Sequence, residues 1–135
     1  MNLKIKNKND SSFSISLGDR GEMVGWAYLL RKGYKILEKN YRCPLGEIDV
    51  IAKRNKRTVF IEIKTRSDHH FGRPEESVHE WKQKKLLQLA QWYLKDKKKT
   101  DQPVSFDVLA ITWRGKDDPE IRLIENAFTA DSLLL

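Results

Sequence analysis

Two neighbouring segments that read as β-strands constrain this chain most, because both carry acidic residues among apolar ones. The first, residues 46–52, contains Asp49, and the second, residues 58–66, contains Glu62. The basic segment between them is short enough to predict an antiparallel hairpin. The register of that hairpin decides whether the two acids meet.

The register that pairs Lys53 with Thr58 brings the acids together. It leaves residues 54–57 as a four-residue loop and places Asp49 opposite Glu62. A slip by one residue would put them on opposite faces of the sheet. Opposed like charges destabilise a sheet unless something compensates them. A divalent cation is the natural compensator for two carboxylates.

The alternation of side chains along a strand adds further charges to this cluster. Lys64 is expected on the face of Glu62, and Glu47 on the face of Asp49, which would place Glu47 opposite Lys64. The other face of the first strand is apolar and holds Ile48, Val50 and Ala52. Two carboxylates and an ammonium group should therefore converge.

Paired carboxylates are ligands of the kind that Mg²⁺ uses, with water and substrate phosphate completing the coordination. Asp49 and Glu62 would supply them, and the backbone carbonyl of Ile63 could add an oxygen. Lys64 is placed to orient or deprotonate a water, or to neutralise charge that develops on a phosphorane. The set predicts metal-dependent hydrolysis of a phosphodiester. The spacing Glu-x-Lys also occurs on solvated sheet faces, so the residues alone leave both interpretations open.

The composition favours a polyanionic partner. The chain has 26 Lys and Arg against 19 Asp and Glu, a net charge of +7, and 33% of its residues are charged. Nucleic acid is such a partner, although other basic proteins share this excess. The residues expected to contact phosphate are Arg54, Lys56, Arg57, Arg66, Arg73, Lys82 and Lys85.

The remaining composition excludes several classes. A single cysteine, Cys43, allows no internal disulfide and fits a reducing compartment. No apolar run approaches the roughly 18 residues of a membrane span, and the amino terminus has no secretory pattern. The protein is therefore expected to be cytoplasmic and not to contact membranes.

Two helices are predicted. The first begins at Asp19 and ends at Gly33, and Asp19-x-x-Glu22 resembles a capping box. Spacing alone favours capping over catalysis for Glu22. The second opens with the capping box Ser77-x-x-Glu80 and runs to about residue 94.

Further strands are predicted at residues 34–42, 104–113 and 121–127. Asp107 lies on an apolar face of the second of these and needs a partner. It is either a structural hydrogen-bond acceptor, the interpretation favoured here, or a remote site residue. Residues 1–16 are expected to be a flexible segment and residues 17–135 a single domain.

The order of helix, strand with Asp49, strand with Glu62-x-Lys64 and second helix resembles the core of the PD-(D/E)xK nuclease superfamily. At a finer level, residues 21–108 resemble the uncharacterised bacterial UPF0102 (YraN-like) family. The resemblance is carried by Gly21-Glu22, Gly33-Tyr34, Asn40, Gly46-Glu47-Ile48-Asp49, residues 60–66, Phe71-Gly72, Val78, Lys82 and Phe106-Asp107.

This resemblance implies an α/β fold with a restriction-endonuclease-like core, in which a central mixed sheet with an antiparallel hairpin is flanked by helices. It implies kinship with archaeal Holliday-junction resolvases, in which a glutamate of the first helix joins the Asp, Glu and Lys. By position Glu22 takes that role, which reverses the preference for capping alone. Ile48 departs from the proline of the superfamily name, and Gly25 stands where the family usually has alanine.

The resulting expectation is a nuclease that uses Mg²⁺, or Mn²⁺ in its place, on branched or distorted DNA. Resolvase action on a two-fold symmetric junction would require a homodimer. The main alternative is a nucleic-acid-binding protein that keeps the fold without catalysis, and a partner-binding scaffold is a third.

Overall fold

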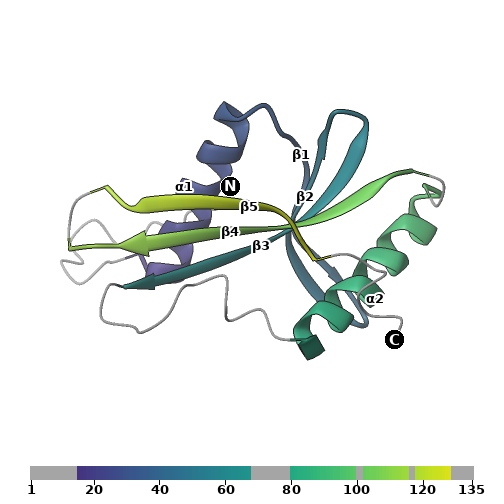
Figure 1. Ribbon diagram of the computed structural model, residues 1–135. Coiled ribbons are helices and arrows are strands. Elements are labelled where there is room, and N and C mark those ends of the chain that lie inside the picture. Colours follow the sequence, from purple (N-terminus) through teal and green to yellow (C-terminus); the bar gives the residue numbers. More distant parts are fainter. Residues whose placement is uncertain (1–14, 68–79, 100–101, 116–117, 129–135) are drawn as a thin grey trace, which may run out of the picture.

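The computed structural model describes residues 15–67, 80–99, 102–115 and 118–128. Its helices and strands follow the order α1 (Leu17–Arg31), β1 (Lys35–Cys43), β2 (Gly46–Arg54), β3 (Arg57–Ser67), α2 (Glu80–Asp96), β4 (Val104–Trp113) and β5 (Glu120–Phe128) (Figure 1). The predicted strands are confirmed, with β4 at its predicted bounds and β1 and β5 within a residue of theirs. Ser77 and residues 1–14 lie outside the described residues.

The strands form one mixed sheet in the order β1-β2-β3-β4-β5. Only β3 and β4 pair in parallel, while the other neighbours are antiparallel. Parallel neighbours need a crossover connection, and α2 lies in the connection between β3 and β4. The α/β arrangement is that of a restriction-endonuclease-like core, as the family resemblance implied. Among the described residues, no helix is both long and apolar enough to cross a membrane.

The two helices cover opposite faces of the sheet (Figure 1). On one face α1 packs through Leu29 onto apolar residues of the central strands, among them Ile61 and Leu109. On the other, α2 packs through Leu89 and Tyr93 onto a cluster that includes Ile51, Phe60, Phe106 and Val108. Because both faces are covered, the central strands β3 and β4 are apolar on both sides, and a charged side chain there is exceptional.

The start of α1 differs from the prediction. The helix is capped by Ser16, whose hydroxyl oxygen accepts a hydrogen bond from the Asp19 N–H at 3.0 Å. Asp19 therefore lies inside the first turn, and the predicted capping box of Asp19 with Glu22 is wrong. The predicted end is confirmed, because Gly33 follows the helix with a φ of 92°, the left-handed value that favours glycine. Glu22 is consequently one turn inside the helix and has no capping role.

The turn between β2 and β3 is shorter than predicted. The expected pairing of Lys53 with Thr58 is confirmed, but Arg54 also pairs with Arg57, so the predicted four-residue loop is a two-residue turn. Asn55 and Lys56 have φ values of 52° and 63°. Positive φ at both central positions is the type I′ geometry, which matches the twist of the strands that it joins.

Gly21 is the point at which α1 approaches the sheet most closely. A Cβ atom at this position would overlap the side chain of Thr65 in β3. We expect Gly21→Ala to lower the free energy of unfolding by roughly 1–3 kcal/mol, because overpacking forces the backbone to move. Gly18→Ala is the matched control in the same helix, since its nearest atom is Ser16 Oγ at 4.0 Å. Urea unfolding of both variants tests this, and an equal loss in both would contradict it.

Candidate active site at the fork between two strands

Strands β2 and β3 separate at the acidic residues. Their pairing continues from the turn to Val50 and Ile61, and the next position in the same register would oppose Asp49 and Glu62. There the ladder is replaced by a side chain, because Asp49 Oδ2 accepts a hydrogen bond from the Ile63 N–H at 2.8 Å. The carboxylate of Asp49 thus lies in the fork between the two strands, beside Glu62.

The alternation of side chains in β2 changes phase at Asp49. Ile48 packs in the cluster covered by α2, whereas Val50 and Ala52 pack in the cluster covered by α1. The prediction that these three share one face is therefore wrong. Asn40 of β1 lies opposite Asp49, between the pairs Lys39–Val50 and Tyr41–Ile48, and has a φ of 51°. Both strands thus deviate from regular geometry at this level, which turns Asp49 towards the fork.

Glu62 is almost fully buried, with 6% of its surface exposed. Its Oε2 atom lies 3.3 Å from Lys64 Nζ and 3.5 Å from Lys82 Nζ. A buried carboxylate is costly unless it is paired, and these two ammonium groups, one from β3 and one from α2, provide the pairing. The position of Lys64 next to Glu62 agrees with the alternation in the sequence. The contact with Lys82 was not foreseen, because it depends on how α2 packs.

The environment raises the pKa of Asp49 from 3.8 to about 7. The first cause is burial, which disfavours the charged form, and the second is the negative charge of Glu62. The hydrogen bond from the Ile63 N–H acts in the opposite direction. The two acids that the sequence predicted to meet are therefore close enough for the charge of Glu62 to raise the pKa of Asp49.

A cleft beside the fork contains Glu22. It is lined by Gly18, Asp19, Glu22, Asp49, Ile63, Lys64 and Thr65. Burial, Asp19 and Glu47 raise the pKa of Glu22. The structure thus brings Glu22 to the same cleft as Asp49 and Lys64, on the α1 side.

Glu47 does not lie opposite Lys64, so that prediction is wrong. It pairs instead with Arg42 of β1, and its Oε2 lies 3.3 Å from Arg42 Nε. In the amide orientation that satisfies its neighbours, Asn40 donates to Glu47 at 3.2 Å and to Glu22 at 3.1 Å. The phase change at Asp49 explains the error. Asn40 is a polar link that the spacing of residues did not reveal, although an asparagine within a predicted strand was a signal for it.

The donor set suits a hard cation held by few protein ligands. Within the described part of the chain, no group of three or more His, Cys, Asp or Glu side chains is gathered as a metal cage. Two adjacent carboxylates are nevertheless a sufficient protein contribution for Mg²⁺, which keeps several waters and binds substrate phosphate. Burial and, after it, the negative charge of Glu62 raise the pKa of Asp49, and a cation between the two carboxylates would favour its charged form. Asp49 and Glu62 therefore fit such a cation.

The predicted phosphate-binding residues occupy different parts of the molecule. Lys82 lies against Glu62, and Lys85 lies near Gly46 at the start of β2. Arg66 lies near the end of β3. Lys56 is in the β2–β3 turn, about 20 Å from Asp49 along the strand. Arg73 lies outside the described residues.

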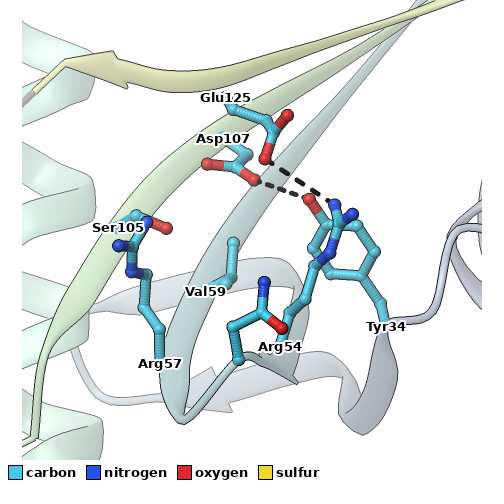
Figure 2. Close-up of a pocket in the computed structure, with 8 residues that line it drawn as sticks. Tyr34, Arg54, Arg57, Val59, Ser105, Asp107 and Glu125 are labelled. Atoms are coloured by element: carbon cyan, nitrogen blue, oxygen red, sulfur yellow. Dashed lines mark hydrogen bonds and ion pairs between the residues drawn. The ribbon is translucent and has the colours of Figure 1, made fainter.

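Arg54 and Arg57 line a small pocket near the β2–β3 turn, with Tyr34, Asp107 and Glu125 (Figure 2). The Arg54 guanidinium lies 4.7 Å from the centre of the Tyr34 ring and 3.6 Å from Glu125. These two arginines are therefore five residues along the strands from the acid pair, a distance of about 17 Å. They lie at the hairpin tip, as predicted, and they do not line the cleft that contains Asp49.

Asp107 is a hydrogen-bond acceptor, as predicted. Its Oδ2 accepts from the Tyr34 hydroxyl at 3.2 Å, and its Oδ1 accepts from the Asn126 N–H at 3.0 Å. Burial raises the pKa of Asp107, and these two hydrogen bonds oppose the shift. Asp107 therefore links β4 to Tyr34, which follows α1, and to Asn126 of β5, and it does not line the cleft that contains Asp49.

Comparisons with known proteins agree with the resemblance found in the sequence. Residues 21–111 match the model of the uncharacterised protein family UPF0102. A UPF0102 protein of Thermodesulfovibrio yellowstonii is 53% identical over 84% of this chain and 96% of its own length. UPF0102 proteins of Clostridioides difficile and Geobacter metallireducens are 46% and 43% identical, over 82% and 84% of this chain and 95% and 92% of their own lengths. The chain belongs to the uncharacterised protein family UPF0102.

Proposed function

We propose that this protein is a metal-dependent nuclease that hydrolyses phosphodiester bonds in branched or distorted DNA. One observation carries the proposal: the partly buried Asp49 and the buried Glu62 lie together at a strand fork, with Lys64 in contact with Glu62. A structural ion pair needs only one carboxylate. A second one that is held beside it, with a raised pKa, is typical of a functional site.

Asp49, Glu62 and the backbone carbonyl of Ile63 would hold Mg²⁺, for which Mn²⁺ could substitute. The cation supplies Lewis-acid polarisation of a phosphoryl oxygen and a water of lowered pKa. The Ile63 N–H fixes the orientation of Asp49, so the carboxylate is set before any cation binds. Preorganisation of this kind is what a catalytic ligand requires.

The remaining charged groups have distinct roles in this proposal. Lys64 orients or deprotonates the attacking water, or neutralises the charge that develops on the phosphorane. Lys82 holds Glu62 from the α2 side. Glu22 faces the same cleft as Lys64 and, with its raised pKa, is suited to accept a proton or to bind water. These groups together form the acid, base and charge set of a hydrolase.

Lysines and arginines outside the acid pair would contact DNA phosphates and carry no sequence specificity. The net charge of +7 supports this role. Lys85 lies close to Gly46 at the start of β2, the strand that carries Asp49. Cleavage of a two-fold symmetric junction would take two copies of the chain.

One observation favours a second function, a nucleic-acid-binding protein without catalysis. Lys64 and Lys82 both contact Glu62, so that carboxylate is balanced without a cation. In a non-catalytic protein these contacts would serve stability alone. The two functions share salt-sensitive DNA binding, so binding does not distinguish them.

A cleavage panel tests the proposal. Linear, flapped and four-way DNA are incubated with Mg²⁺ or Mn²⁺ and with wild type, Asp49→Ala or Lys64→Ala. We expect wild type to cut at least one branched DNA and both variants to be deficient. The absence of cleavage by all three proteins, with DNA binding retained, would favour the non-catalytic function.

A further inference from the structure

The outward face of α2 carries two exposed tryptophans. Trp81 is 69% exposed and Trp92 is 41% exposed. Three turns of helix separate them, so they lie on the same side of α2, about 16 Å apart along its axis. Single exposed apolar side chains are common on protein surfaces, so the residues around the two rings decide what this face can bind.

Polar and basic residues occupy the positions between and beyond these rings. Lys84, Gln88 and Lys95 follow Trp81 on the same side of the helix and are exposed. We call the set Trp81, Lys84, Gln88, Trp92 and Lys95 the outer stripe. The opposite side of α2 is buried against the sheet through Leu86, Leu89, Ala90 and Tyr93. Lys84 lies 3.6 Å from Glu80, but both side chains are mostly exposed, so this pair is weak.

Aromatic rings alternating with ammonium groups match the chemistry of single-stranded nucleic acid. Unpaired bases stack on aromatic side chains, and lysines contact the phosphates between them. The bases of a duplex are already stacked on one another and are not available to Trp81 or Trp92. The rings are too far apart to form one apolar patch, and the other side of the helix is buried, so insertion into a lipid surface is disfavoured.

The outer stripe begins next to a residue that contacts the acid pair. Lys82, the residue after Trp81, lies 3.5 Å from Glu62. A strand that stacks on Trp81 would therefore lie at the end of α2 from which Lys82 reaches Glu62. The stripe continues from that point along α2 to Lys95, on the face of the sheet opposite α1 (Figure 1).

We propose that the outer stripe binds a single-stranded DNA segment, with bases stacked on Trp81 and Trp92 and phosphates on Lys84 and Lys95. This inference rests on the proposed nuclease function, and it specifies the substrate as DNA with an unpaired strand beside the scissile phosphate. A flap or a splayed arm meets that description, and a fully paired duplex does not.

Binding without divalent cations tests the stripe separately from cleavage. Anisotropy of labelled oligothymidylate and of a blunt duplex of equal length is measured with wild type, Trp81→Ala and Trp92→Ala. Each variant should bind oligothymidylate roughly tenfold more weakly, as expected for the loss of one stacked base, and the duplex with little change. Trp81→Phe should retain most of the affinity. Leu30→Ala, which removes a 59% exposed side chain from α1, is the matched control and should bind as wild type does.

Three results would overturn the inference. The first is unchanged oligothymidylate affinity in both alanine variants. The second is binding to phosphatidylglycerol vesicles that these variants lose while their oligothymidylate binding is unchanged. The third is a wild-type dimer that dissociates in Trp92→Ala with unchanged oligothymidylate affinity.

If the variants bind oligothymidylate weakly but wild type cuts no DNA, the proposed nuclease function is contradicted and the proposed binding by the outer stripe is supported. If wild type and both variants cut a flap at equal rates, the stripe fails and the nuclease stands.

Discussion

Asp49→Asn should stabilise the metal-free protein above the raised pKa of Asp49. The folded-state pKa of about 7 lies above the ordinary value of 3.8, so the folded state binds the Asp49 proton more tightly than the unfolded state does. The stability due to this proton is present in full below the ordinary pKa and is lost as the pH rises from about 4 to about 7. The neutral amide of asparagine avoids that loss, and its oxygen can still accept the hydrogen bond from Ile63.

The size of this effect follows from the shift. A shift of about three pKa units corresponds to about 4 kcal/mol, as an upper limit for the loss between these pH values. Denaturant unfolding of wild type and Asp49→Asn across this pH range, with a chelator present, measures it. Glu22 and Asp107 also have raised pKa values, and they make a similar contribution to the pH dependence of the unfolding free energy in both proteins. Parallel stability curves for the two proteins would contradict the prediction.

Lys64→Ala should reduce DNA cleavage by roughly 10²–10⁴-fold while the affinity for DNA changes little. The reason is position: Lys64 Nζ lies 3.3 Å from Glu62, beside the cleft that contains Asp49. Lys64→Arg should remain slow, because the larger planar guanidinium cannot take the position of the ammonium group beside Glu62. Single-turnover rates, with binding measured in parallel, test this prediction.

Lys82→Ala is the matched control for that experiment. It removes the other ammonium group on Glu62 but leaves the cleft residue Lys64 in place. We expect a smaller loss of rate than in Lys64→Ala. Equal losses in both variants would mean that Lys64 acts only by balancing the charge of Glu62, which would contradict a direct role in the reaction.

Local rules predicted the hairpin. Strict alternation in β3 placed Glu62 and Lys64 on one face. The register that pairs Lys53 with Thr58, one of those that the short basic turn allowed, is the one observed. The proximity of Asp49 and Glu62 followed from that register. The number of residues in the turn did not, because Asn55 and Lys56 both adopt left-handed φ values that the spacing does not encode.

The features of the site that the sequence did not predict depend on long-range packing. The phase change at Asp49 occurs opposite the left-handed Asn40 of β1, and no pattern within β2 alone reveals it. That change redirects Glu47 from Lys64 to Arg42. The contact of Lys82 with Glu62 depends on the placement of α2 across the sheet.

The position of Glu22 beside the cleft was not apparent from the sequence pattern, because a capping box offered a local alternative. Asp19-x-x-Glu22 matches a capping box, but Ser16 takes the capping position, which leaves Glu22 free of that role and beside the cleft. The family resemblance identified Glu22 where periodicity did not. A cap two or three residues earlier changes the interpretation of every acid in the first turn.

The most direct test is the single-turnover rate at which wild type and Asp49→Asn cut flapped DNA in Mg²⁺, above the raised pKa of Asp49. The metal-free variant is expected to be more stable than metal-free wild type at this pH, so a loss of activity is not expected to come from misfolding. We predict cleavage by wild type and a rate at least about 10²-fold lower in the variant. Equal rates in the two proteins, or no cleavage by wild type, would contradict a catalytic metal site at Asp49 and Glu62.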